Sequence, residues 1–106
     1  MRKSFTKDIL EVAIGPIIAI SIPIERLDDY YTQEDPRNEI IDLYGGKTIS
    51  WELAEPLLNY VYDNGFGAMD CHNIVAWTES QVIFIHEYDG ATDVRTLPRN
   101  PEPLNN

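Results

Sequence analysis

The sequence has little positive charge, one cysteine and no long apolar run, and each shortage excludes a class of protein. Its 106 residues hold 18 Asp and Glu against 8 Lys and Arg, a formal net charge of −10. Nucleic acid and anionic membrane surfaces would repel such a chain, so we expect it to bind neither directly. One cysteine cannot form a disulfide within the chain, so packing alone must hold the fold.

The longest apolar stretch, residues 12–24, is shorter than the roughly 20 apolar residues that cross a bilayer. Pro16 and Pro23 interrupt it, and no small-x-small cleavage site follows. The isoleucines of residues 17–24 suit a buried, pleated surface, so we predict a strand there instead of an export signal; the alternative is a strand that extends back through Leu10. Without a disulfide pair, the chain is expected in the cytoplasm.

Enough apolar residues are present for one folded domain. Hydrophobic residues make up 43% of the chain, which excludes an intrinsically disordered acidic tail. A length near 100 residues predicts a single domain, which we place at residues 1–97. Three prolines follow within a few positions, so residues 98–106 are expected to form an extended, proline-rich tail.

Two segments carry apolar residues at helical spacing. The first is residues 5–13, with Ser4 or Thr6 as its cap and Gly15-Pro16 as its end. The second is residues 53–62, and residues 63–65 are expected to stop it. Pro56 must either kink this second helix or lie near its start, because proline removes a backbone hydrogen bond.

The last third of the chain alternates in the manner of strands. Strands are expected at residues 73–78, 82–88 and 93–97, with turns at 79–81 and 89–90. The middle strand is apolar on both faces, which predicts an interior position in a sheet. The fold class is therefore α+β, a single domain of two helices on a mostly antiparallel sheet with a C-terminal three-stranded β-meander.

The cluster of side chains best suited to chemistry is Asp70, Cys71 and His72. A thiolate beside an imidazole can act as a nucleophile, and all three residue types bind metals. Neighbours on an extended chain point to opposite faces, however, which separates Cys71 from His72. We therefore favour a buried cysteine and a hydrogen-bonded histidine. A metal site built from Asp70, His72, His86 and a carboxylate such as Asp89 is the weaker hypothesis, and we expect no metal, cofactor or catalytic residue.

The distribution of acidic residues along the chain says more about function than any motif. Residues 48–94 hold eight acids and no base, and residues 25–42 are acidic as well. Carboxylates on a rigid scaffold can take the place of phosphates, and tyrosines among them can anchor a contact. We leave open whether residues 25–42 are a functional loop or a solvated connection. The predicted partner-binding residues are Glu25, Asp28, Asp29, Tyr30, Tyr31, Glu34, Asp35, Glu79, Glu87 and Asp89.

Residues 51–101 contain the runs W-E-L-A-E-P-L-L-N-Y, N-G-F-G-A-M-D-C-H, A-W-T-E, H-E-Y-D-G-A-T and L-P-R-N-P. This half of the chain resembles short acidic proteins of bacteria and their phages, of unassigned role, so no residue role comes from the resemblance. In size and composition the whole chain is similar to phage-encoded inhibitors of host defence, of the anti-CRISPR and anti-restriction types. That resemblance implies an anti-defence protein, a DNA mimic, in the host cytosol.

The expected function is a non-enzymatic acidic inhibitor that blocks the basic, nucleic-acid-binding surface of a partner protein. One alternative is an immunity or antitoxin protein that neutralises a toxin by the same electrostatics. Another is a small metal or Cys-His enzyme centred on residues 70–72. A homodimer is also plausible, because a small sheet can leave an edge strand unpaired.

Overall fold

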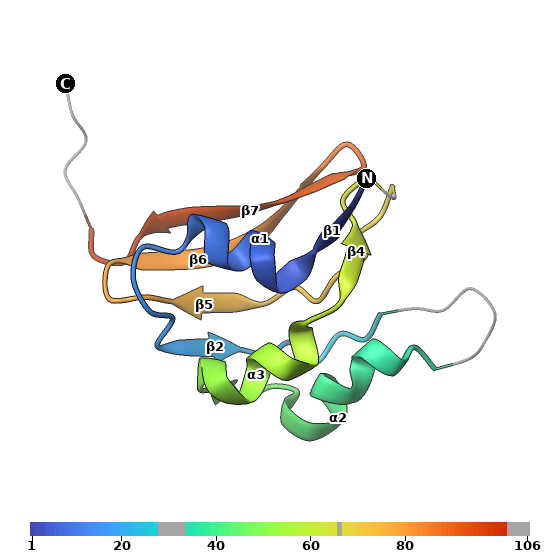
Figure 1. Ribbon diagram of the computed structural model, residues 1–106, viewed down its shortest axis with the longest axis horizontal. Helices are drawn as coiled ribbons and strands as arrows, with labels where there is room; N and C mark the ends of the chain where they lie inside the picture. The colour runs from blue at the N-terminus through green and yellow to red at the C-terminus, as the bar shows by residue number, and fades with distance from the viewer. Residues whose placement is uncertain (28–33, 66, 102–106) are drawn as a thin grey trace.

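Two layers make up the molecule, as the computed structural model shows for residues 1–27, 34–65 and 67–101 (Figure 1). One layer is an antiparallel five-stranded sheet. The other contains helices α1, Phe5–Val12, and α3, Trp51–Leu58. Helix α1 packs against the sheet near one edge and α3 near the other. The predicted α+β class is confirmed.

The sheet has the strand order β3-β2-β5-β6-β7. Its strands are β2 (Ala19–Ser21), β3 (Thr48–Ile49), β5 (Val75–Trp77), β6 (Gln81–Tyr88) and β7 (Ala91–Pro98). The last three form the predicted β-meander, and β6 has a neighbour on each side as predicted. The predicted strand at the N-terminal isoleucines exists, but regular pairing covers only three residues of it.

Local capping explains where α1 and α3 begin. The side chain of Ser4 accepts a hydrogen bond from the Lys7 N–H, and Ser50 accepts one from the Leu53 N–H. A third helix, α2 (Glu39–Tyr44), follows the 3-10 turn Pro36–Asn38. Two helices were predicted, and six residues are too few to show a helical period. No helix in the three described segments is long and apolar enough to cross a membrane.

The predicted second helix ends earlier than its apolar spacing indicates. Helix α3 stops at Leu58, and Val61 and Tyr62 belong to strand β4 (Val61–Asp63). That strand pairs with β1 (Arg2–Ser4) in a separate two-stranded sheet. Pairing with a distant segment overrides the local helical spacing here, and residues 63–65 follow a strand instead of stopping a helix.

The core lies between the helices and one face of the five-stranded sheet. Ile20, Ala76 and Ile83 pair across the sheet, and all three are completely buried. Phe5, Ile9 and Leu58 cover them from the helical layer. On the opposite face the side chains of Trp77, Val82 and Phe84 are half-buried, and none of the described helices covers that face.

The predicted tail starts within the sheet. Pro98 is the last residue of β7, and Arg99 still donates hydrogen bonds to the carbonyls of Ser80 and Thr78. Residues 102–106 lie outside the described segments.

Candidate protein-binding surface

Those predicted partner-binding acids that the structure describes lie in three separate regions. Asp28, Asp29, Tyr30 and Tyr31 lie outside the described residues. Glu25 is exposed, whereas Glu34 forms an ion pair with Arg26. Asp35 is turned inward: its carboxylate bonds Arg37 at 2.7 Å, and its side chain is only 12% exposed. The guanidinium of Arg37 keeps the pKa of Asp35 below its usual value.

Glu79 is separated from Glu87 and Asp89. Glu79 lies in the turn between β5 and β6, whereas Glu87 and Asp89 lie at the other end of β6. A strand of that length spans about 25 Å. The three acids are all exposed, but a single small contact cannot include them all.

The residues Asp70, Cys71 and His72 lie in an irregular segment before β5, not on a strand. Arg37 bridges Asp70 to Asp35, with one guanidinium nitrogen 3.0 Å from a carboxylate oxygen of Asp70. His72 is 1% exposed and points elsewhere, toward Tyr60 and Asn38.

Hydrogen bonding fixes the tautomer of His72. The side-chain oxygen of Asn38 accepts the Leu27 N–H, and its amide nitrogen donates to the Leu27 carbonyl. His72 Nε2, 3.1 Å from the same Asn38 oxygen, must therefore carry the hydrogen. Nδ1 is left to accept from the Tyr60 hydroxyl at 2.8 Å. Burial, and then the charge of Arg37, lowers the pKa of His72 to about 4.

Cys71 is a buried thiol. It is 2% exposed, and burial followed by the charge of Asp70 raises its pKa to about 12. Reactive cysteines have the opposite surroundings, an accessible site with a depressed pKa. The predicted buried cysteine and hydrogen-bonded histidine are confirmed.

The four residues of the hypothetical metal site do not converge. His86 lies on the uncovered face of the sheet and contacts Asp93 at 3.1 Å, whereas His72 lies in the interior. Within residues 1–27, 34–65 and 67–101, no group of three or more His, Cys, Asp or Glu side chains could hold a metal ion.

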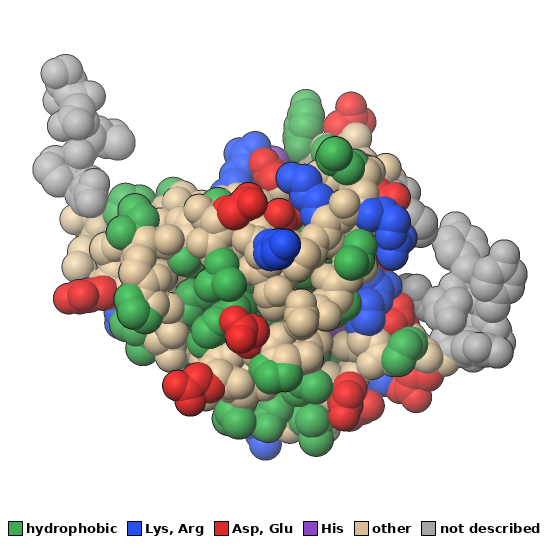
Figure 2. All heavy atoms as spheres, in the orientation of Figure 1, with side chains coloured by type: hydrophobic (Ala, Val, Ile, Leu, Met, Phe, Trp, Pro, Cys, Tyr) green, Lys and Arg blue, Asp and Glu red, His purple; other side chains and the backbone are tan. Residues whose placement is uncertain are grey.

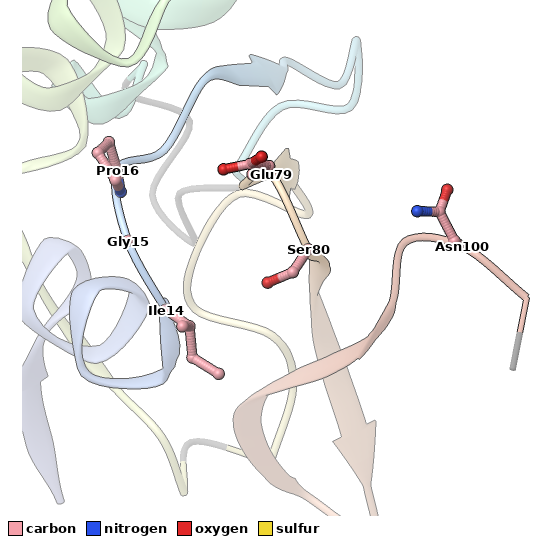
Figure 3. A pocket seen from close by; sticks show the side chains of 6 residues that line it. All are labelled: Ile14, Gly15, Pro16, Glu79, Ser80 and Asn100. Atoms are coloured by element: carbon pink, nitrogen blue, oxygen red, sulfur yellow. The ribbon is translucent and has the colours of Figure 1, made fainter.

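Two hollows flank the loop of residues 13–18, which joins α1 to β2. A hollow of about 530 Å³ lies on one side of it, lined by Ile14, Gly15, Pro16, Glu79, Ser80 and Asn100. Figure 3 shows Glu79 and Ser80 between the loop and Asn100. A second hollow of about 420 Å³ is lined by Leu10, Gly15, Pro16, Ile17, Ile18, Ser50, Trp51 and Glu52. We call the loop and both hollows the loop surface.

Gln81 holds this loop in place. Its side-chain oxygen accepts the Ile14 N–H at 2.6 Å, and its amide nitrogen donates to the Val12 carbonyl at 2.9 Å. Gln81 is buried at the start of β6, so the loop is tied to the sheet. Gly15, with φ of +80°, allows the chain to turn there.

The loop surface combines exposed apolar side chains with acid. Ile14 is 69% exposed, Ile18 54% and Leu10 45%. Glu79 and Glu52 line one hollow each, and no Lys or Arg is among the lining residues. The neighbouring Arg99 donates to the carbonyl of Thr78. Figure 2 shows exposed apolar side chains on the helical side of the molecule, with acidic side chains between them.

Comparison with protein families, curated proteins and solved structures returned no match. The resemblance to short phage and bacterial proteins therefore stays a prediction. Of the loop surface, sequence reasoning identified Glu79 and missed two isoleucines: it assigned Ile18 to a buried strand and gave Ile14 no role. Gly15-Pro16, used in the sequence analysis only as the end of a helix, is the signal that could have found them, because a turn there places the flanking side chains outside the regular sheet.

Proposed function

We propose that the protein is a non-enzymatic, acidic inhibitor that docks on a basic, nucleic-acid-binding surface of a partner protein in the cytoplasm. The loop surface is its contact site. The observation that carries this proposal is the combination there of exposed isoleucines with Glu52 and Glu79, on a loop that Gln81 fixes. Apolar anchors would supply affinity, and the acids would supply attraction and orientation.

Internal ion pairs between residues that the structure describes occupy three of the eight basic side chains. Arg26 is bound by Glu34 and Asp42, and Arg37 by Asp35 and Asp70. Arg95 is paired with Asp93. These scarce basic side chains are therefore engaged within the chain. The acids of α3 and of the β5–β6 turn have no basic partner among the described residues and remain available to another protein.

The first experiment identifies the partner and its chemistry. The protein is used to capture interactors from its native host, and the captured protein is purified and tested for nucleic-acid binding with and without the inhibitor. We expect a basic partner that loses nucleic acid when the inhibitor is added, and a complex that weakens as salt is raised. A complex that salt leaves unchanged would contradict the proposal.

The second experiment locates the contact with two matched variants. Glu52→Lys with Glu79→Lys alters the loop surface, and Glu25→Lys with Glu87→Lys makes the same charge change elsewhere. We expect the first pair to weaken binding at least tenfold more than the second. Equal losses would mean that only the overall charge matters, and a larger loss from the second pair would move the contact to another face.

The identity of the captured partner also tests the antitoxin alternative. If the captured partner is a toxin encoded by a neighbouring gene, the acidic surface serves an immunity protein that neutralises this toxin. If the partner is a nuclease of host defence, the protein is an anti-defence inhibitor.

A further inference from the structure

Strand β7 is an edge of the five-stranded sheet, and two hydrogen bonds show how its backbone is oriented. The N–H of Thr92 donates outward, away from β6, to the Asn64 carbonyl at 2.7 Å. The N–H of Arg99 donates inward to Ser80, just before β6, at 2.9 Å. Because backbone groups alternate along an antiparallel strand, the N–H groups of Val94 and Thr96 also face outward.

These outward groups lie in an open stretch of the edge. Within the described segments, neither the Val94 nor the Thr96 N–H has a hydrogen-bond partner outside its own sheet ladder. Asn64 covers the edge at Thr92, and Pro98, which lacks an N–H, ends the strand. Figure 1 shows no described element on the outer side of β7, away from β6, at the C-terminal end of the strand. An edge of this kind is a template for another strand.

The charge of this stretch differs from that of the rest of the chain. Residues 91–99 contain Arg95 and Arg99 but only one acid, Asp93. A second copy of a protein with a net charge of −10 would be repelled by most of its surface. At the β7 edge two copies can meet without bringing acids together.

We propose that two copies of the chain associate through β7, antiparallel, with Thr96 opposite Thr96 of the second copy. In that register each Val94 N–H reaches the Pro98 carbonyl of the other copy, and the two Thr96 residues exchange hydrogen bonds. Asp93 stands opposite Arg99 of the second copy. The two sheets become one ten-stranded sheet, and all four outward N–H groups are satisfied.

The neighbouring registers are less favourable. A two-fold axis at Arg95 would place the two Arg95 side chains directly opposite each other, and like charges in that position are destabilising. An axis at Val94 would place Thr96 of the second copy where Asn64 already lies against Thr92. Centring on Thr96 leaves Asn64 beyond the paired segment.

Light scattering after gel filtration, or sedimentation equilibrium, measures the association over a range of concentrations. We expect a mass that rises with concentration from 12.1 kDa to twice that value. Thr96→Pro removes the outward N–H without touching the β6–β7 ladder and should return the mass to that of the monomer. Thr96→Val, which keeps the N–H, is the matched control and should dimerise normally. Should Thr96→Pro fail to fold, Thr96→Lys keeps the N–H and places like charges at the axis, with the same expected loss.

Crosslinking checks the register. Thr96→Cys should form a disulfide between copies under mild oxidation, because residues in a hydrogen-bonded pair lie about 5.5 Å apart. Val94→Cys, two positions away, should not. The native Cys71 is buried and does not compete. A protein that stays monomeric at every concentration, a dimer that the Thr96 variants leave intact, or crosslinking at 94 instead of 96 would overturn the proposal.

Discussion

Tyr60 and His72 are joined by two hydrogen bonds. The Tyr60 hydroxyl accepts the backbone N–H of His72 at 2.9 Å and donates to its Nδ1 at 2.8 Å. The side-chain oxygen of Asn38 accepts a hydrogen bond from the other ring nitrogen, Nε2. The imidazole therefore connects residues from three parts of the chain. Burial also raises the pKa of Tyr60 above its usual value, which keeps its hydroxyl protonated as a donor.

Lowering the pH should destabilise the folded protein, because His72 becomes protonated. The folded protein has a His72 pKa of about 4, below the 6.5 of an unfolded chain. The unfolded state therefore binds more protons between these values, and the stabilisation is complete above pH 6.5. We expect the free energy of unfolding to fall by at most about 3 kcal/mol as the pH drops from 6.5 to 4. Urea titrations across that range measure it. His72→Gln, which cannot titrate, should flatten the slope, whereas His86→Gln leaves His72 in place and should keep it.

Removing the Tyr60 hydroxyl should cost more than removing that of Tyr62. Tyr60→Phe leaves two groups of buried His72 unpaired, at a cost of about 1–3 kcal/mol in the free energy of unfolding. Tyr62→Phe removes a donor to Asp8, a partly exposed carboxylate that water can solvate. We expect a loss of about 1 kcal/mol or less there. Urea unfolding compares the two variants, and equal losses would contradict the structural role of the Tyr60–His72 pair.

Cys71 should be unreactive in the native state. With 2% exposure and a pKa raised to about 12, it presents neither an accessible sulfur nor a thiolate at neutral pH. Labelling with a thiol reagent such as DTNB should follow unfolding, and become fast only in denaturant. Rapid labelling of the folded protein would contradict this prediction and revive the Cys-His enzyme hypothesis.

The features that sequence predicted are those with a local cause. The β-meander follows from alternation and from Asp89–Gly90, whose φ angles of 50° and 84° both suit a two-residue hairpin turn. Strand β4 could not be predicted, because it depends on pairing with β1, about 60 positions away in the chain. Local spacing favoured a helix there, and the distant partner decided otherwise.

The candidate site was predicted only in part for a similar reason. Glu79 is identified from its position in a turn. Asp35 has the same charge, but Arg37 draws it inward, and Arg37 is itself held by Asp70, 33 positions further along the chain. The composition gives the number of acidic residues, but the fold determines which of them face solvent.

The last prediction compares one substitution at two positions in the isoleucine run. Ile18 is 54% exposed on the loop surface, whereas Ile20, two positions later, is completely buried in β2. Ile20→Ala should lower the free energy of unfolding by about 2–5 kcal/mol, because it leaves a cavity between sheet and helices. Ile18→Ala should change it by about 0.5 kcal/mol or less. Thermal and urea unfolding measure both. A large loss from Ile18→Ala would mean that Ile18 supports the core, and the loop surface would then lack one of its apolar anchors.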